Sequence, residues 1–195
     1  MPTIGPEHRV VLDVGCGAGQ TLIASNLEAI AVAVGIDIDQ AALVLGRQLT
    51  TKVKFVRAKG EALPFGSDTF DLVICRVAIP YMNIPLALHE MSRVLRRGGA
   101  LWLVLHSSSF VLWELRRAIR LLNVKGVCFL AYVLLNGAVF HLTGRQFAFP
   151  FGPKRYESCQ TSRGITIALR RTSFGDIDID RDDIKRSLIV TARKL

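Results

Sequence analysis

The stretch Val10–Gln20, VVLDVGCGAGQ, constrains this chain most. Five mainly apolar residues of strand-like composition run directly into glycines at three alternating positions, Gly15, Gly17 and Gly19. Because glycine has no Cβ, a ligand can come close to the backbone N–H groups of such a turn and to the N-terminus of the helix behind it. The stretch therefore predicts a strand, a tight turn and a helix that together form a nucleotide-type cofactor site.

The spacing of the three glycines and the carboxylate of Asp13 indicate which kind of cofactor the turn would bind. A dinucleotide-binding turn has the pattern G-x-G-x-x-G, which would need a glycine where Gln20 stands. The pattern here is D-x-G-x-G-x-G, and Asp13 would repel a pyrophosphate but would suit the ammonium group of an amino-acid moiety. Residues Asp13–Gly19 thus resemble motif I of the class I S-adenosylmethionine (SAM) methyltransferases. The cofactor-binding residues that this resemblance implies are Asp13, Gly15, Cys16, Gly17 and Gly19.

A second carboxylate follows the next apolar run. Ile30–Ile36 is a predicted buried strand, and Asp37 ends it. In nucleotide-binding α/β folds, a carboxylate at the tip of the second strand holds the ribose hydroxyls. We therefore expect Asp37, with Ile38 beside it, to bind the cofactor. Asp39 instead suits the N-cap of a helix over Gln40–Leu49.

The segment after the third predicted strand, Val53–Arg57, extends the resemblance. Residues Ala58–Phe65 read AKGEALPF, where many small-molecule methyltransferases of this group have G-D-A-E-x-L-P-F. The resemblance implies that the Asp of that motif meets the adenine amino group, and this chain has Lys59 at its position. We therefore expect the backbone around Gly60 and Glu61 to carry the adenine side of the cofactor.

The fourth predicted strand, Thr69–Arg76, resembles the F-D-x-V segment of the same family. Its end lies at the sheet edge that carries the glycine turn, where ligands of open α/β sheets bind. The backbone of Arg76 is expected beneath the sulfonium. Only Pro80 precedes Tyr81, and no Asp or Asn leads it. The D/N-P-P-Y motif of amino-group DNA and protein methyltransferases is therefore missing, and no DNA partner is expected.

The order of the elements predicts the fold. Strands and helices alternate as far as a helix with Asn83 as its N-cap and Gly98 as its left-handed stop, and a fifth strand, Leu101–Leu105. This alternation is typical of a parallel α/β sheet. Phe174–Asp180 and Ser187–Ala192 then form two strands joined by a short link, which implies an antiparallel hairpin. We expect a Rossmann-like, doubly wound, seven-stranded and mostly parallel sheet with an antiparallel C-terminal hairpin. That tail is typical of class I methyltransferases and not of ordinary dinucleotide folds.

The composition is that of one folded domain. A chain of 195 residues with 50% apolar residues can bury a sizeable core, and we expect a single methyltransferase domain over residues 1–195. The four cysteines lie far apart and form no C-x-x-C pair, so neither a metal site nor a disulfide framework is expected. Residues 1–9 contain no apolar segment of a secretory signal, and a cytoplasmic location is expected.

The net charge of +9 is unevenly placed. Residues 1–90 carry a net charge of −2, and residues 91–195 carry +11. A basic surface can meet nucleic acid, an anionic membrane surface or an acidic substrate. The alternative is an ordinary solvated surface, because the arginines are scattered over several predicted elements. RNA or an anionic membrane therefore remains a candidate partner beside the expected small-molecule substrate.

The stretch Val124–Leu142 is the most unusual one. Its segment Val127–Leu135 is apolar without a polar face, and basic residues stand before it. A bilayer span needs about 20 such residues. Three interpretations compete: a buried helix between the fifth strand and the final helix, an apolar lid over a hydrophobic substrate, and an interfacial anchor whose arginines meet anionic lipid, so that the protein is peripherally membrane-associated. We expect an apolar helical insertion or lid around residues 108–150.

The chemistry that the resemblance implies needs no catalytic constellation. The methyl group of a sulfonium is already activated, so the protein need only hold a nucleophile in line with it and exclude water. His106, near the end of the fifth strand, is a candidate general base or merely a loop hydrogen-bonding group. Tyr81 is the other catalytic candidate. The candidate acceptor-binding residues are Tyr81, His141, Arg145 and Tyr156.

The predicted function is SAM-dependent methyl transfer to a small, apolar or aromatic acceptor. Two alternatives remain open at this point. One is an RNA-binding or RNA-modifying protein that uses the basic C-terminal half. The other is a SAM-binding protein without transfer activity, which the departure at Lys59 makes conceivable.

Overall fold

The computed structural model describes residues 1–2, 4–25, 27, 30–105, 108–151, 156–181 and 187–195. Seven strands of this described part form one sheet with the order β3-β2-β1-β4-β5-β7-β6. Their bounds are β1 (Val10–Val14), β2 (Val32–Asp37), β3 (Val53–Arg57), β4 (Phe70–Arg76), β5 (Leu95–Val104), β6 (Phe174–Arg181) and β7 (Leu188–Lys194). β1 to β5 pair in parallel, whereas β7 runs antiparallel to both β5 and β6. The predicted fold class is confirmed.

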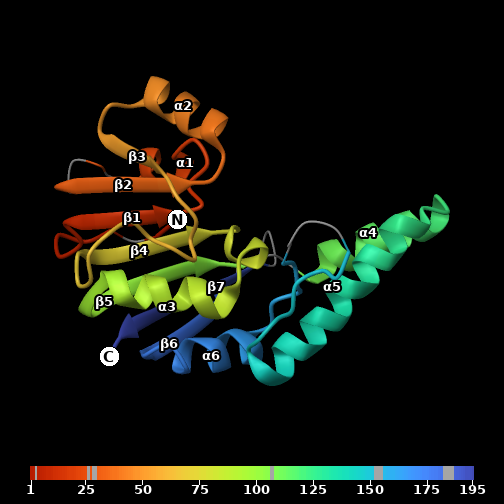
Figure 1. The fold of residues 1–195 in the computed structure, drawn as a ribbon. Coiled ribbons are helices and arrows are strands. Elements are labelled where there is room, and N and C mark those ends of the chain that lie inside the picture. Colours follow the sequence, from red (N-terminus) through yellow and green to blue (C-terminus); the bar gives the residue numbers. More distant parts are fainter. Residues whose placement is uncertain (3, 26, 28–29, 106–107, 152–155, 182–186) are drawn as a thin grey trace.

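Helices cover both faces of this sheet (Figure 1). The helices are α1 (Gln20–Ile23), α2 (Gln40–Leu49), α3 (Ile84–Val94), α4 (Ser108–Arg120), α5 (Val124–Thr143) and α6 (Ser162–Arg170), with a short 3₁₀ helix, η2 (Ile79–Tyr81). α1 and α2 pack on one face, and α3 and α6 pack on the other. The side chains of Asp39 and Asn83 accept hydrogen bonds from the first turns of α2 and α3, so both predicted N-caps are confirmed.

The core is divided by the sheet into two apolar layers, because successive side chains of a strand point to opposite faces. On β1, Val11 packs with Leu43 of α2, and Leu12 packs in the layer that contains α3. Val73 and Ile74 of β4 alternate in the same way. Central parallel strands are therefore apolar on both faces, which explains their nearly continuous hydrophobic sequences.

The predicted end of the third helix at Gly98 is wrong. α3 ends at Val94, and β5 already begins at Leu95, which pairs with Phe70 of β4. The backbone N–H of Thr69 donates to the carbonyl of Val94 at 2.8 Å, so strand pairing takes over from the helix at this point. Gly98 does have the left-handed conformation expected of it, with φ 72°, but within an irregular stretch of β5.

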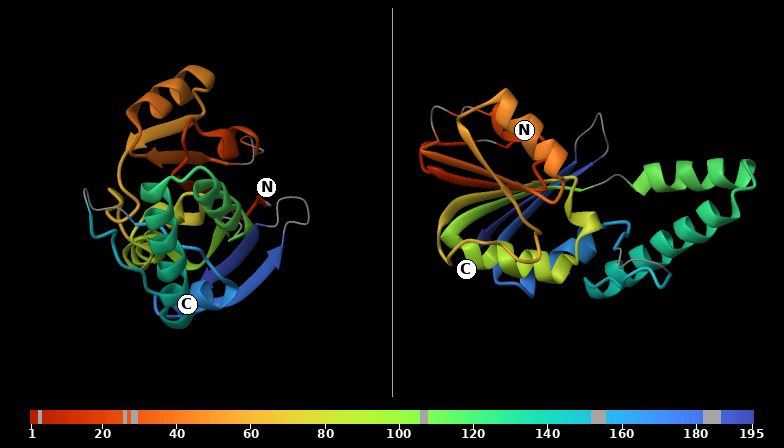
Figure 2. Two further views of the ribbon diagram at one scale, coloured as in Figure 1. Left: turned by 90° about the vertical axis from the view of Figure 1, so that its right-hand side faces the viewer. Right: turned by 45° about the horizontal axis from the view of Figure 1, so that its top comes forward.

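α4 and α5 form an antiparallel hairpin that leaves the sheet at the end of β5 and projects well beyond it (Figures 1 and 2). By length and composition alone, α5 would be able to cross a membrane, although 28% of its apolar window is buried inside the protein. The buried residues all lie from Tyr132 onward: Tyr132, Val133, Asn136, Gly137 and Phe140. α5 is thus a core helix along its C-terminal part, which packs on α6, and a partly exposed helix nearer the hairpin turn, where it packs on α4.

One buried amide joins α5 to the body of the protein. Asn136 is fully buried, and its Nδ2 donates to the carbonyls of Glu157 at 2.8 Å and Phe147 at 3.0 Å. Its Oδ1 accepts a hydrogen bond from the backbone N–H of Phe147 at 3.0 Å. The rings of Phe147 and Phe149 pack edge-on against Tyr132 of α5. The aromatic loop after α5 therefore folds back onto the helix and holds it.

We expect Asn136→Ala to lower the free energy of unfolding by about 2–4 kcal/mol, because it leaves several backbone groups of the loop without buried partners. Urea unfolding followed by circular dichroism measures this change. Leu135→Ala, at the neighbouring and exposed position, is the matched control and should cost less than about 1 kcal/mol. Equal losses for the two variants would contradict the anchoring role of Asn136.

Candidate functional site

The glycine turn after β1 is the tight turn that its sequence predicts, with a left-handed backbone that glycine adopts readily. Gly15, Gly17 and Gly19 all have positive φ, at 72°, 56° and 83°. A Cβ on Gly15 would collide with the side chain of Ala78, which follows β4. The turn is therefore closed against the next strand of the sheet, and larger residues at Gly15 would push the two apart.

The carboxylate of Asp37 ties this turn to the end of β2. Its Oδ2 accepts a hydrogen bond from the backbone N–H of Gly17 at 2.8 Å, and its Oδ1 accepts one from the N–H of Asp39 at 2.9 Å. Since Asp37 is only half-buried, its carboxylate remains open to a ligand on the cavity side. The parallel pairing of β1 with β2 brings the two segments together at the carboxyl edge of the sheet.

Asp13 lies deeper in the same region and is almost fully buried within β1. Neither carboxylate oxygen has a hydrogen-bond partner among the described residues. Burial raises the pKa of Asp13 to about 7, a rise that the charge of Arg76 opposes and that of Asp37 reinforces. A buried carboxylate without a partner is costly for the unliganded fold, and a cation is the ligand that would relieve this cost.

The loop after β3 forms another wall. Gly60 packs against Met82, and a Cβ at this position would come within 2.5 Å of the Met82 sulfur. The Oε1 of Glu61 accepts a hydrogen bond from the backbone N–H of Asn83 at 2.8 Å, and the Nδ2 of Asn83 donates to the Tyr156 hydroxyl at 3.1 Å. Three segments distant in the sequence therefore meet at Asn83.

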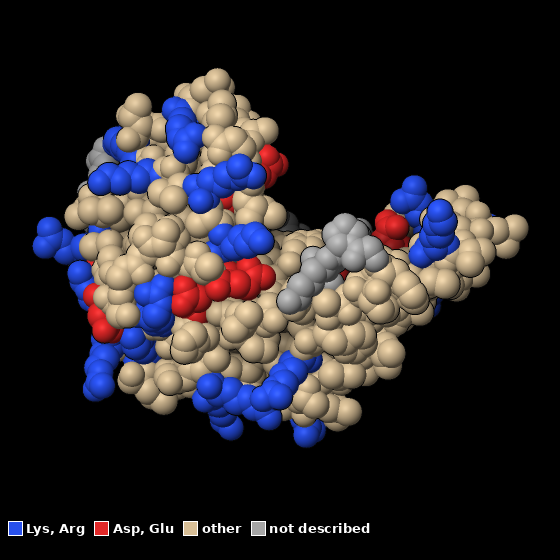
Figure 3. Space-filling view, viewed as in Figure 1, with Lys and Arg blue, Asp and Glu red and all other residues tan. Residues whose placement is uncertain are grey.

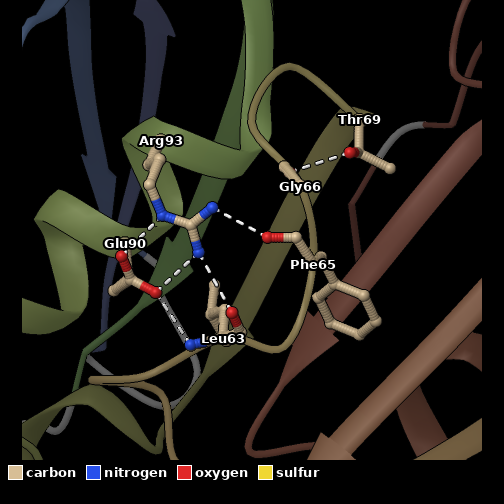
Figure 4. A network of polar contacts seen from close by, with 6 residues as sticks. All are labelled: Leu63, Phe65, Gly66, Thr69, Glu90 and Arg93. Carbon is tan, nitrogen blue, oxygen red and sulfur yellow. Dashed lines mark hydrogen bonds and ion pairs between the residues drawn. The ribbon is translucent and has the colours of Figure 1, made fainter.

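An ion pair on α3 holds the continuation of this loop in place (Figure 4). Arg93 donates to both carboxylate oxygens of Glu90, to the Phe65 carbonyl at 2.7 Å and to the Leu63 carbonyl at 3.0 Å. Glu90 in turn accepts a hydrogen bond from the backbone N–H of Leu63 at 2.8 Å. These bonds lower the pKa of Glu90, with the Arg93 contact as the main cause. The clamp fixes the loop that begins at Gly60 to the helix beneath it.

These segments surround a cavity of about 570 Å³ at the carboxyl edge of the sheet. Its volume lies in the range of ordinary cofactor and ligand sites, roughly 300–1,000 Å³. The predicted site residues that line it are Gly15, Asp37, Ile38, Gly60, Glu61, Tyr81 and Tyr156. The sequence did not identify five of the lining residues: Ala58, Ala78, Met82, Asn83 and Leu86. Lys59 lines the cavity too, and the sequence showed it only as a departure from the family pattern. A half-buried apolar residue in a turn, such as Met82, or an exposed one on a helix, such as Leu86 of α3, is too common to signal a site.

The other predicted cofactor residues stand around this cavity without lining it. Cys16, Gly17 and Gly19 build the turn, and Asp13 lies within the sheet. The side chain of Arg76 donates to the Thr21 hydroxyl at 3.0 Å, which joins the end of β4 to α1. Directly after Arg76, Val77 has a φ of 62°, an unusual value for a β-branched residue, and it redirects the chain into the cavity wall.

The structure does not bring two of the acceptor candidates to the cavity. His141 lies on α5, where its Nδ1 is 3.0 Å from the Thr161 hydroxyl of the α6 cap. Arg145 lines a separate hollow beside Phe147 and Arg171. Both therefore stay predictions. His106 lies outside the described residues, and Tyr81 is the one catalytic candidate that the described structure places at the cavity.

Comparisons with known proteins agree with this geometry. Residues 12–103 match the model of a methyltransferase domain family, Methyltransf_11. The chain is similar to the uncharacterized methyltransferase YcgJ of Bacillus subtilis, 34% identical over 106 residues that cover 51% of this chain and 41% of that protein. It is also 38% identical over 113 residues to the ubiquinone/menaquinone biosynthesis C-methyltransferase UbiE of Agrobacterium fabrum, covering 51% of this chain and 42% of that protein. The chain thus spans about two fifths of the length of these relatives.

A solved structure shares the whole fold. The SAM-dependent methyltransferase of Thermotoga maritima, described as a possible histamine N-methyltransferase, superposes with a TM-score of 0.64 and 14% identity, over 95% of this chain and 82% of that one. At this identity the likeness shows the fold alone. Together with the sequence match over residues 12–103, this fold supports a class I SAM-dependent methyltransferase of the UbiE-like group.

Proposed function

We propose that the chain binds SAM in the 570 Å³ cavity and catalyses transfer of its methyl group to a small, apolar or aromatic acceptor. The observation that supports this most is the position of Asp37, a carboxylate at the end of β2 that lines the cavity and is tied to the glycine turn. In nucleotide-binding α/β folds, this position serves the ribose hydroxyls.

The residues present fit the cofactor at three points. The unpartnered carboxylate of Asp13 offers a negative charge near the glycine turn for the ammonium of the methionine moiety. Asp37 offers acceptors for the ribose. The backbone at Gly60 and Glu61 lines the adenine side, with Ile38 as an exposed apolar surface for a ring. Lys59 also lines the cavity and cannot accept a hydrogen bond from an adenine amino group, so recognition there falls to the backbone.

SAM supplies an activated methyl group when bound, and the chain's own residues would position the acceptor and exclude water. The remaining wall of the cavity is suited to an apolar or aromatic molecule, since Tyr81, Met82, Leu86 and Tyr156 line it. The backbone after Arg76 would form the floor between donor and acceptor, because Ala78 borders both Gly15 and the cavity. Tyr81 is the described residue best placed to contact the accepting atom.

Transfer itself is tested with methyl-labelled SAM and a cell extract divided into lipid-soluble and aqueous pools. The proposal expects label in small molecules of the lipid-soluble pool. Label confined to RNA would instead support an RNA-modifying enzyme, and SAM binding without any transfer would support a binding protein.

Asp37→Ala should weaken SAM binding by about 10- to 100-fold, because it removes charge-assisted hydrogen bonds to the ribose. Isothermal titration calorimetry measures the affinity. Asp39→Ala is the matched control: its side chain caps α2 and does not line the cavity, so it should lower stability by about 1 kcal/mol and leave SAM affinity nearly unchanged. Undiminished binding by Asp37→Ala would count against the assigned site.

Asp13 should make SAM binding depend on pH. With a pKa of about 7, Asp13 is largely neutral at pH 5.5 and about half ionised at pH 7. Only the ionised form attracts an ammonium group, so affinity should rise roughly tenfold across this interval. Calorimetry at the two pH values measures the change, and Asp13→Asn should flatten it. An equally steep rise in Asp13→Asn would rule out Asp13 as the titrating group.

Asp13 should also affect the stability of the unliganded chain. Its folded pKa of about 7 exceeds the ordinary 3.8, so the folded state binds more protons than the unfolded state between these values. The free energy of unfolding should therefore fall as pH rises from about 4 to about 7, by up to about 4 kcal/mol. Urea unfolding of the wild type and of Asp13→Asn across this range isolates the contribution, which the variant should lack.

A further inference from the structure

The turn of the α4–α5 hairpin presents a cluster of apolar side chains to solvent. Leu122 is 86% exposed, Val124 71%, Leu121 67% and Ile119 54%. Leu122 also has a left-handed backbone with φ 50°, which is unfavourable for leucine and turns its side chain outward. We call these four residues the hairpin tip. A monomeric soluble protein rarely collects aliphatic side chains at its most protruding point, so the hairpin tip marks an interaction surface.

Basic side chains lie next to the hairpin tip in the sequence, and Arg120 lies between two of its residues. Arg116, Arg117 and Arg120 of α4 and Lys125 of α5 are all exposed. Glu114 is the single acidic residue in the sequence of residues 108–135, and it pairs with Arg117 at 3.5 Å. Figure 3 shows Lys and Arg side chains beside the tan end of the hairpin. We call the four basic side chains the basic collar. Apolar side chains with basic ones beside them match an anionic bilayer surface, where lipid phosphates lie just outside the acyl chains.

The buried half of α5 determines how far such a hairpin can enter a membrane. Asn136 hydrogen-bonds to backbone groups of the following loop, and Phe140 packs in the main core. The protein covers one face of the C-terminal half of this helix, so that half cannot be surrounded by lipid. Insertion is therefore limited to the hairpin tip and the first turns of α5, despite the apolar composition of the whole helix.

We propose that the hairpin tip docks this protein on an anionic phospholipid bilayer. Leu121, Leu122 and Val124 enter the boundary between headgroups and acyl chains, while the basic side chains contact lipid phosphates. RNA fits this surface less well, because recognition of single-stranded RNA uses aromatic stacking and hydrogen bonds to base edges, which aliphatic side chains do not supply. A second copy of the chain fits less well too, since tip-to-tip contact would bring two like-charged collars together.

Flotation with phospholipid vesicles tests this docking on the intact chain and requires no methyl acceptor. The wild type should float with vesicles that contain phosphatidylglycerol, float far less with pure phosphatidylcholine, and lose binding as salt is added. The double variant Leu122→Asp/Val124→Asp should lower the vesicle partition coefficient at least roughly tenfold. Arg116→Gln/Arg120→Gln should reduce binding to the anionic vesicles by a similar factor and leave the weak binding to neutral vesicles unchanged.

The matched control is Val44→Asp/Leu45→Asp on α2, which carries the same two changes at exposed apolar positions far from the hairpin. It should float like the wild type. Thermal unfolding and SAM titration of all three variants should match the wild type, so a loss of flotation cannot be attributed to unfolding or to the cofactor site.

The proposal is overturned if the wild type does not float with anionic vesicles, or if Leu122→Asp/Val124→Asp floats as well as the wild type. Equal losses in this variant and in the α2 control would also overturn it. Analytical ultracentrifugation adds one further outcome: dimers of the wild type that the tip variant abolishes, without vesicle binding, would assign the surface to a second copy of the chain.

Discussion

The hydrogen bond from the Gly17 backbone to the Asp37 carboxylate is the interaction on which the site depends. It joins the turn after β1 to the end of β2 at the point where parallel pairing has already placed them side by side. The N–H groups of Gly15 and Cys16 already donate to the Ile36 carbonyl, and the bond to Asp37 satisfies the next N–H of the turn and orients the carboxylate that borders the cavity. A ligand at this edge therefore meets groups that the sheet has positioned before it arrives.

The far wall of the cavity depends on α3 in a different way. Arg93 and Glu90 bind the loop after β3 through its backbone, so this part of the loop's support does not involve the loop's own side chains. Glu61 and Asn83 then connect the loop to the start of the same helix. Helix α3 thus supports the loop after β3 and the segment at Asn83, both of which line the cavity. The loop can therefore depart from the family pattern at Lys59 and still form this wall of the cavity.

The α4–α5 hairpin differs from the sheet in how much of its apolar surface the protein buries. Its α5 helix is apolar throughout, yet only the half that carries Asn136 and Phe140 is buried by the protein. The part nearer the turn is only partly covered, and the hairpin tip keeps its apolar side chains exposed beside basic ones. Folding stability explains the apolar side chains of the buried part, whereas those of the hairpin tip are the basis for the proposed contact with a bilayer.

Sequence alone determined the order of strands and helices, the glycine turn, the N-caps at Asp39 and Asn83, and the carboxylate at Asp37, because these are set by local conformation and by the spacing of nearby residues. Tertiary structure decided that α3 ends at Val94, that Met82 and Leu86 line the cavity, and that His141 and Arg145 do not. It also decided which half of α5 is buried. The physical reason is that these features arise from contacts between segments distant along the chain, and an apolar sequence has the same composition whether protein, lipid or water covers it.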